Sequence, residues 1–192
     1  MESSGQDEAR FKLGEFTTLA VRHHAGIAVS VPAPRFLLSR VKPGILGLEA
    51  SQVGVAAWVD AGVPHLVIWT PGQSQLELET LGPRLMTHPA FEPGGTNVNL
   101  CWGEGPDGSL KLRTWERGVC GETLACGTGA VACAAVWLEH HGLERVSCRV
   151  ASGHELVVEK GSLEWTLHGP ARRTFKGTTQ LPAGAGPAGG KV

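Results

Sequence analysis

The chain of 192 residues lacks several features that would place it in a common class of proteins. It has no tyrosine, and its formal net charge of −1 gives no electrostatic basis for binding nucleic acid. No apolar run approaches the length of a membrane span, and the polar residues 1–10 contain no apolar segment of the kind found in secretory signals. These absences favour a cytoplasmic protein whose partner is neither a membrane nor a nucleic acid.

Metal-binding cysteine patterns are also missing from the sequence. Five cysteines are present, but none belongs to the paired Cys-x-x-Cys spacing of zinc ribbons, so no metal site is expected. A cytosolic chain of this length can bury a core without disulfides, and we therefore expect all five to be thiols. A bond between Cys120 and Cys126 is the open alternative.

Glycine and proline are plentiful, at 27 and 12 residues, which suits many short strands joined by turns. A short helix is expected over residues 76–86 and irregular structure over residues 32–50. The segments expected as strands are a pair within 16–31, then 54–60, 65–70, 96–102, 109–117, 146–150, 155–160 and 163–168.

Residues 127–141 are the only long helix that the pattern predicts, and Gly142 ends it as a C-cap residue. From Ala130 to Leu138 no polar residue occurs for nearly three turns, which indicates a helix buried on all sides. Because most other elements are strands, the sequence predicts an α+β fold in which a curved sheet or barrel is wrapped around this central helix. The helix N-terminus should open at one mouth of the wrap.

Cys126 stands at the start of this helix, where unpaired N–H groups and the helix dipole favour a reactive, low-pKa thiolate. The amides of Gly127 and Thr128 can cradle an anion such as a carboxylate. Glu116 and Arg117 close the preceding strand, and this pair suits the ammonium and carboxylate groups of an amino acid. An exposed ion pair is the alternative for these two residues.

The sequence Glu116-Arg117-Gly118, followed by residues 122–130, resembles the second catalytic motif of the diaminopimelate epimerase family. Residues 59–65 resemble the Asp-x-Gly-Asn-Pro-His turn of that family, and residues 95–99 resemble its substrate-binding asparagine segment. Two further segments fit in order, Leu81-Gly82-Pro83 and Gly169-Pro170-Ala171.

This resemblance implies a cofactor-independent isomerase that converts LL-diaminopimelate to the meso form, for lysine and peptidoglycan biosynthesis. In that mechanism two cysteines on opposite faces of the substrate α-carbon remove and return its proton. The carried-over roles are catalysis by Cys126, substrate binding by Asn97, Glu116, Arg117, Gly127 and Thr128, and modulation of the thiol pKa by His65 and Glu116.

The sequence also departs from the family pattern. It has no Cys-Gly-Asn-Gly motif to supply the other catalytic cysteine, so we expect an incomplete epimerase that lacks the first part of a full-length enzyme. Val63 replaces an asparagine, and Phe175 stands where the family often has a tyrosine near its dimer contact, which makes a homodimer one expectation. The alternatives are a non-catalytic amino-acid-binding paralogue and a truncated fragment.

The resemblance divides the chain into consecutive parts. The expected parts are a disordered leader at 1–15, a remnant of the first epimerase domain at 16–50, the second epimerase domain at 51–170 with its buried helix at 127–141, a return strand at 171–181 and a disordered tail at 182–192.

Overall fold

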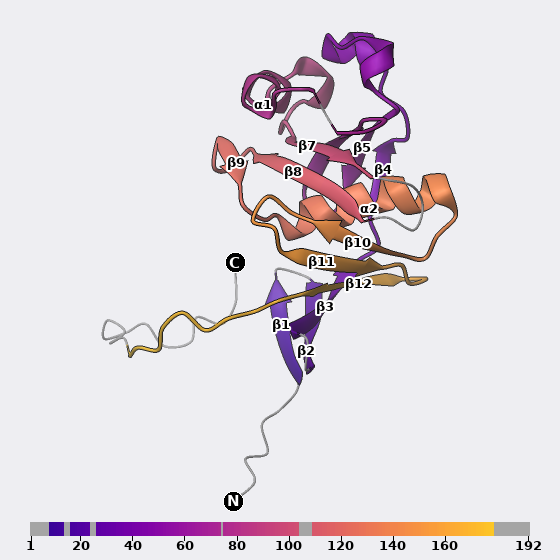
Figure 1. Ribbon diagram of the computed structural model, residues 1–192. Helices are drawn as coiled ribbons and strands as arrows, with labels where there is room; N and C mark the ends of the chain where they lie inside the picture. The colour runs from indigo at the N-terminus through magenta and orange to yellow at the C-terminus, as the bar shows by residue number, and fades with distance from the viewer. Residues whose placement is uncertain (1–7, 14–15, 24–25, 74, 104–108, 179–192) are drawn as a thin grey trace, which may run out of the picture.

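The structure is a computed structural model that describes residues 8–13, 16–23, 26–73, 75–103 and 109–178 (Figure 1). The helices are α1 (Leu78–Met86) and α2 (Gly127–His141), with 3₁₀ turns at Pro43–Leu46, Ala50–Gln52 and Pro89–Phe91. The strands are β1 (Glu8–Leu13), β2 (Phe16–His23), β3 (Gly26–Pro32), β4 (Arg35–Leu38), β5 (Val55–Asp60), β6 (Pro64–Trp69), β7 (Asn97–Trp102), β8 (Leu110–Glu116), β9 (Gly121–Thr123), β10 (Arg145–Arg149), β11 (Glu155–Glu159) and β12 (Glu164–Gly169). None of the helices in these ranges is long and apolar enough to cross a bilayer.

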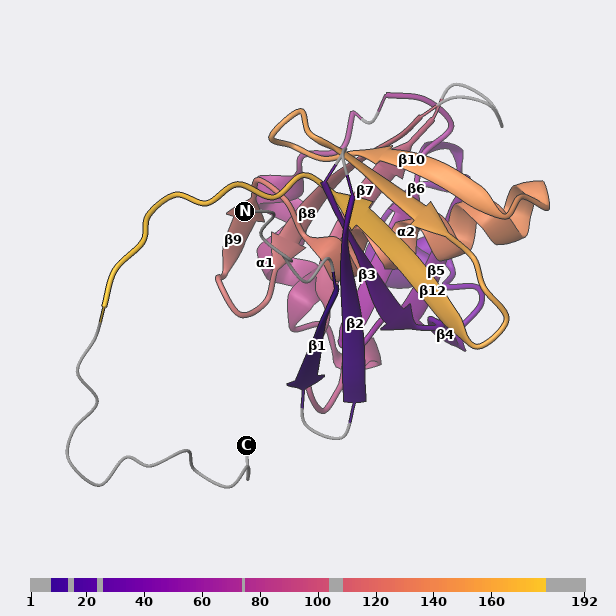
Figure 2. The same ribbon diagram turned by 90° about the horizontal axis from the view of Figure 1, so that it is seen from below.

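All the strands belong to one mixed sheet, in the order β1-β2-β3-β12-β11-β10-β8-β7-β6-β5-β4, with β9 paired to β8. The pairing of β12 with β3 joins the N-terminal strands to the C-terminal meander (Figure 2). The centre of the sheet contains two parallel pairings, β6 with β7 and β8 with β10, and the remaining pairings are antiparallel. The first and last parts of the chain therefore lie in one continuous sheet.

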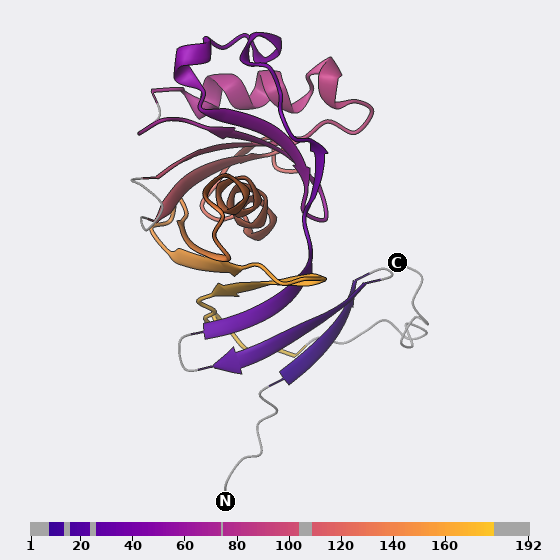
Figure 3. The same ribbon diagram turned by 90° about the vertical axis from the view of Figure 1, so that its right-hand side faces the viewer.

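Helix α2 lies between two parts of this sheet, as the end-on view in Figure 3 shows. Strands β5 to β8 lie on one side of the helix and β10 to β12 on the other, and α1 covers the outer face of the first group. Every residue of α2 from Gly129 to Leu138 is buried, because the helix has strands on both sides. Gly142 ends α2 in a left-handed conformation with a φ of 65°.

Strand β6 shows why its sequence is continuously apolar. Val67 packs into the core around α2, whereas Leu66 and Ile68 point to the opposite face and pack into the core beneath α1. Successive side chains of a strand alternate between faces, so a strand covered on both faces needs apolar residues throughout. The strand thus separates the two cores, and His65 is its second residue.

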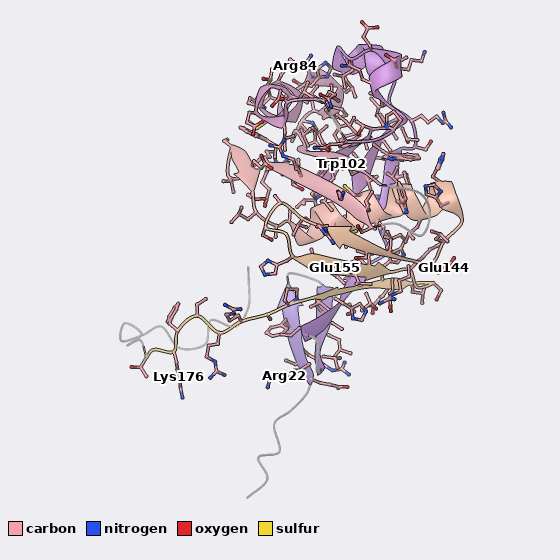
Figure 4. The ribbon with its side chains drawn as sticks, in the orientation of Figure 1. Arg22, Arg84, Trp102, Glu144, Glu155 and Lys176 are labelled. Carbon is pink, nitrogen blue, oxygen red and sulfur yellow. The ribbon has the colours of Figure 1, made fainter. Side chains whose placement is uncertain are left out.

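Several sequence-based expectations differ from the structure. Residues 8–13, expected in a disordered leader, form β1, whose pairing with β2 supplies its backbone hydrogen bonds. Residues 171–178, expected in a return strand, form no strand, and Figure 4 shows Lys176 on this segment as it leaves the body. Within 32–50, expected to be irregular, β4 pairs with β5. The expectations for 1–7 and 179–192 lie outside the described residues.

Replacement of Gly82 by alanine is expected to lower the free energy of unfolding by about 1–2 kcal/mol, although alanine is the better helix former. A Cβ atom at this position of α1 would overlap the indole ring of Trp115, so the helix or the ring would have to shift. Chemical denaturation measures the effect. Gly44→Ala is the matched control, since nothing lies within 4 Å of its added Cβ. An equal loss in both variants would contradict the packing explanation.

Candidate active site

Cys126 is the N-cap residue of α2, in an extended conformation with φ −133° and ψ 111°. Its sulfur accepts a hydrogen bond from the Gly129 N–H at 3.4 Å and lies 3.5 Å from the hydroxyl oxygen of Thr128. The side chain is largely buried, with 7% of the residue exposed. The first turn of the helix therefore places the Gly129 N–H and the Thr128 hydroxyl beside the sulfur, and the helix is buried from Gly129 to Leu138.

A cavity of about 400 Å³ opens in front of this thiol. Its walls come from β3, the β5–β6 turn, the end of β8, the start of α2 and β12, so strands far apart in the sequence meet there. The lining residues are Val31, Ala61, Glu116, Ala125, Cys126, Gly127, Thr128, Val131 and Leu167. We call this cavity the Cys126 pocket. Four of the sequence-predicted site residues, Glu116, Cys126, Gly127 and Thr128, are among its lining residues.

Glu116 is fixed at the edge of the pocket by a neighbouring strand. Its Oε1 accepts a hydrogen bond from the Thr123 hydroxyl at 2.6 Å, and the pairing of Glu116 with Gly121 brings β9 alongside it. The carboxylate lies close enough to Cys126 for its negative charge to raise the thiol pKa. Glu116 thus faces the thiol as a fixed acceptor.

Strand β9 was not expected from the sequence, and a charged side chain of β8 secures it. The Arg113 guanidinium donates to both carboxylate oxygens of Glu122, from Nε at 2.7 Å and Nη2 at 2.5 Å, and to Glu79 of α1 at 2.8 Å. Such a two-pronged contact sets orientation as well as distance. Because β9 leads directly into the loop before Cys126, this contact helps to set the path of the chain into the site.

Arg117 follows Glu116 in the chain but is held by different partners. Its guanidinium Nη1 donates to the carbonyl oxygens of Gly94 and Gly95, and its backbone N–H donates to Asn97 Oδ1 at 2.8 Å. The residue does not belong to the set that lines the pocket. Because Arg117 bonds to the 94–95 turn and Glu116 bonds to Thr123, each has a partner other than its neighbour, unlike the simple ion pair considered above.

His65 and Asn97 lie behind the pocket. His65 is fully buried, with Nε2 at 3.0 Å from the Thr128 hydroxyl and 3.4 Å from Asn97 Nδ2. Burial is the largest influence and lowers the pKa of His65 to about 4. The ring is therefore neutral at pH 7 and reaches Cys126 only through Thr128.

Asn99 joins this group and was missed by the sequence analysis. It lies on the same face of β7 as Asn97, and its Nδ2 is 3.0 Å from His65 Nδ1. Its side chain also bonds to Thr114 of β8 and to the Leu66 carbonyl. The signal that could have revealed it is the spacing of two asparagines by two residues in a strand, because such residues share a face.

The expected low pKa of Cys126 is wrong in direction. Burial raises the pKa of the thiol and the Glu116 charge raises it further, against the lowering effect of hydrogen bonds from Thr128 and Gly129. The helix N-terminus favours the thiolate, but withdrawal from water disfavours any charged form. All five cysteines are free thiols, and within the described ranges no group of three or more His, Cys, Asp or Glu side chains is arranged to hold a metal ion.

Comparison with known proteins gives matches to the diaminopimelate epimerase family. A family model described as diaminopimelate epimerase matches residues 57–174. A diaminopimelate epimerase from Gemmatimonas aurantiaca is 42% identical over 143 residues, covering 67% of this chain and 50% of the relative. One from Chlorobaculum tepidum is 39% identical over 143 residues, covering 70% and 53% respectively. The chain thus spans about half the length of the curated relatives it matches.

Solved structures share the fold at low sequence identity. A phenazine biosynthesis PhzF-family protein from Enterococcus faecalis superposes with a TM-score of 0.64 at 14% identity, covering 93% of this chain and 67% of that one. A protein from Pseudomonas aeruginosa, described as a predicted epimerase, has a TM-score of 0.61 at 18% identity, with 88% and 65% covered. These likenesses support a mixed α+β fold that consists mostly of sheet.

Iodoacetamide is expected to label Cys120 before Cys126 at pH 7, because Cys120 is exposed whereas burial raises the pKa of the Cys126 thiol. The buried Cys101, Cys133 and Cys148 should label last. Peptide mapping after timed alkylation, repeated across pH, measures each rate. Labelling of Cys126 ahead of Cys120 at pH 7 would contradict the dominance of burial over the helix dipole.

Acid is expected to destabilise the protein through His65. Its pKa is about 4 in the folded chain against an ordinary 6.5, so between these values the unfolded chain binds a proton that the folded chain does not. The free energy of unfolding should fall by about 3 kcal/mol in total as the pH drops from 6.5 to 4. Denaturation at several pH values tests this, with His65→Gln removing the dependence and the exposed His154→Gln retaining it. A pH dependence unchanged in His65→Gln would assign it to other groups.

Proposed function

Because the chain belongs to the diaminopimelate epimerase family, we propose that it is an amino-acid isomerase whose reacting centre is the Cys126 pocket. The observation that carries the proposal is the position of Cys126, at the N-cap of a buried helix and in the wall of a cavity that Glu116 also lines. A thiol beside the unpaired amides of a helix terminus can act on a carbon next to a carboxylate. The proposed reaction is conversion of LL-diaminopimelate to its meso form.

In this proposal the substrate carboxylate lies at the first turn of α2, where the backbone N–H groups of Gly127 and Thr128 bind it. The Cys126 thiolate takes the α-proton and becomes a thiol. The electron pair of the broken C–H bond stays on the substrate and spreads into its carboxylate, where the same N–H groups stabilise the added charge. A second acid on the opposite face then returns a proton, which inverts the centre.

The raised pKa of Cys126 suits this chemistry in both directions. A thiolate whose pKa is raised is less populated at pH 7, but it is a stronger base toward the weakly acidic C–H bond. In the reverse reaction the neutral thiol is ready to donate its proton. Both transfers use side chains, so the proposed reaction needs no cofactor.

The other polar groups around the pocket have binding and supporting roles in this proposal. The Glu116 carboxylate accepts one hydrogen bond from the Thr123 hydroxyl and lines the pocket. It can therefore accept a further hydrogen bond from the ammonium group of the substrate. Asn97 and Arg117 are joined by a hydrogen bond and do not line the pocket, so we assign them to holding the 94–97 turn beside it. The substrate is a biosynthetic amino acid, which suits the cytoplasmic location expected from the sequence.

The 192-residue chain is expected to exchange the α-hydrogen of a diaminopimelate isomer slowly in D₂O, with negligible inversion. Cys126 is the one thiol that lines the pocket in the described part of the chain, and two-base inversion needs a second acid on the other face. NMR measures the exchange, and chiral chromatography of the same sample measures inversion. Cys126→Ala should abolish exchange.

The matched control is Cys120→Ala, because Cys120 is exposed and does not line the pocket. Exchange that persists in Cys126→Ala would contradict the assignment of the base. Binding without any exchange would favour the non-catalytic amino-acid-binding alternative. Efficient inversion by the 192-residue chain would show that another group, a water molecule or a second subunit supplies the opposing acid.

A further inference from the structure

The side-chain amide of Asn99 has only one orientation that its neighbours accept. Its Nδ2 donates to the Leu66 carbonyl at 3.1 Å, and its Oδ1 accepts from the Thr114 hydroxyl at 2.9 Å. A peptide carbonyl can only accept a hydrogen bond, so the atom that faces Leu66 has to be the NH₂ group. A flipped amide would place two oxygens against each other in a fully buried site.

The same NH₂ group faces Nδ1 of His65 at 3.0 Å. A donor there requires a lone pair on Nδ1, which leaves the ring hydrogen of the neutral imidazole on Nε2. The other tautomer would let Nε2 accept from Asn97 Nδ2, at the longer distance of 3.4 Å. It would also place the Nδ1 hydrogen against the hydrogens of Asn99. The contacts therefore favour the Nε2–H form.

The Nε2–H group points to the Thr128 hydroxyl oxygen, 3.0 Å away. A hydroxyl that accepts from His65 still has its own hydrogen to donate, and the Cys126 sulfur lies 3.5 Å from it. We propose that Asn99 is a positioning residue, which holds His65 in the Nε2–H form and so keeps the Thr128 hydroxyl turned toward the Cys126 sulfur. The catalytic meaning of this chain of hydrogen bonds rests on the proposed function, but its geometry does not.

The start of helix α2 is shaped to lie against this group. A Cβ atom at Gly129 would come within 2.8 Å of Asn99 Oδ1 and 3.0 Å of the Thr114 hydroxyl. Such contacts are closer than side-chain carbons normally make, so only glycine lets the first turn approach the Asn99–Thr114 pair. That approach also brings the Gly129 N–H to the Cys126 sulfur, which thus has donors from both the backbone and Thr128.

Nitrogen NMR of the histidine ring tests the tautomer directly, because protonated and unprotonated ring nitrogens have well-separated shifts. The 192-residue chain is labelled with ¹⁵N-histidine, and the His65→Gln variant identifies the His65 signals. We expect a neutral ring with hydrogen on Nε2 at pH 7. A ring with hydrogen on Nδ1, or on both nitrogens, would overturn the proposal.

Alkylation of Cys126 across pH tests the consequence. Thr128→Val removes the hydroxyl and is expected to slow labelling about tenfold below the thiol midpoint, equal to a midpoint about one pH unit higher. Thr128→Ser keeps a hydroxyl and should retain the parent midpoint. Asn99→Leu should raise the midpoint in the same direction as Thr128→Val, and the double variant should add nothing further, because both changes remove one donor from the sulfur.

Full additivity of the two changes, or an unchanged midpoint in a folded Asn99→Leu variant, would overturn the positioning role. If Asn99→Leu does not fold, the NMR tautomer together with the Thr128→Val and Thr128→Ser pair decides the question. Neither measurement uses substrate. Failure of the deuterium-exchange experiment would therefore count against the epimerase proposal alone, and failure of these measurements against the positioning role alone.

Discussion

Burial of helix α2 on all sides is the constraint from which the rest of the structure follows. From Gly129 to Leu138 the helix has no exposed residue, so each side of it needs an apolar partner. A single sheet supplies these partners by passing along both sides of the helix (Figure 3). Only the two ends of the helix are therefore free to present a functional group, and its N-terminus carries Cys126.

The same burial governs the chemistry of the site. It raises the pKa of Cys126 and lowers that of His65, so burial favours the neutral form of both groups. The contacts that run from His65 through the Thr128 hydroxyl to the Cys126 sulfur are then the main local influence on the charge of the thiol. Where water is excluded, a neutral donor such as the Thr128 hydroxyl stabilises a thiolate more effectively than it would at a surface. The reactivity of the thiol in such a site depends more on which atoms donate hydrogen bonds to it than on the net charge around it.

Local sequence pattern predicts the elements whose signals lie within or beside them. The apolar run and Gly142 define α2, and the turn at Ala61-Gly62 defines the β5–β6 hairpin, because these signals lie within a few residues of the elements they form. The family was also correctly identified from its motif. Strand β9 was missed, because its three residues depend on pairing with β8 and on the distant contact of Arg113 with Glu79.

The features of the site that the sequence did not reveal have a common physical cause. The helix dipole at Cys126 is visible in the sequence, whereas the burial that outweighs it comes from strands far along the chain. Likewise, nothing local predicts that the Arg117 guanidinium bonds to Gly94 and Gly95. Asn99 was overlooked because its role depends on which atoms of β6 and β8 lie beside it.

The junction between β8 and β10 has a mechanical consequence. Among the residues that the structure describes, two pairs form the backbone ladder there, Cys148 with Leu110 and Arg149 with Lys111. The part of the sheet formed by β5 to β8 and the part formed by β10 to β12 are consequently kept apart by the side chains of α2. Many of these side chains are the methyl groups of alanines. Both parts of the sheet line the Cys126 pocket. The thickness of a single helix thus sets the width of the pocket.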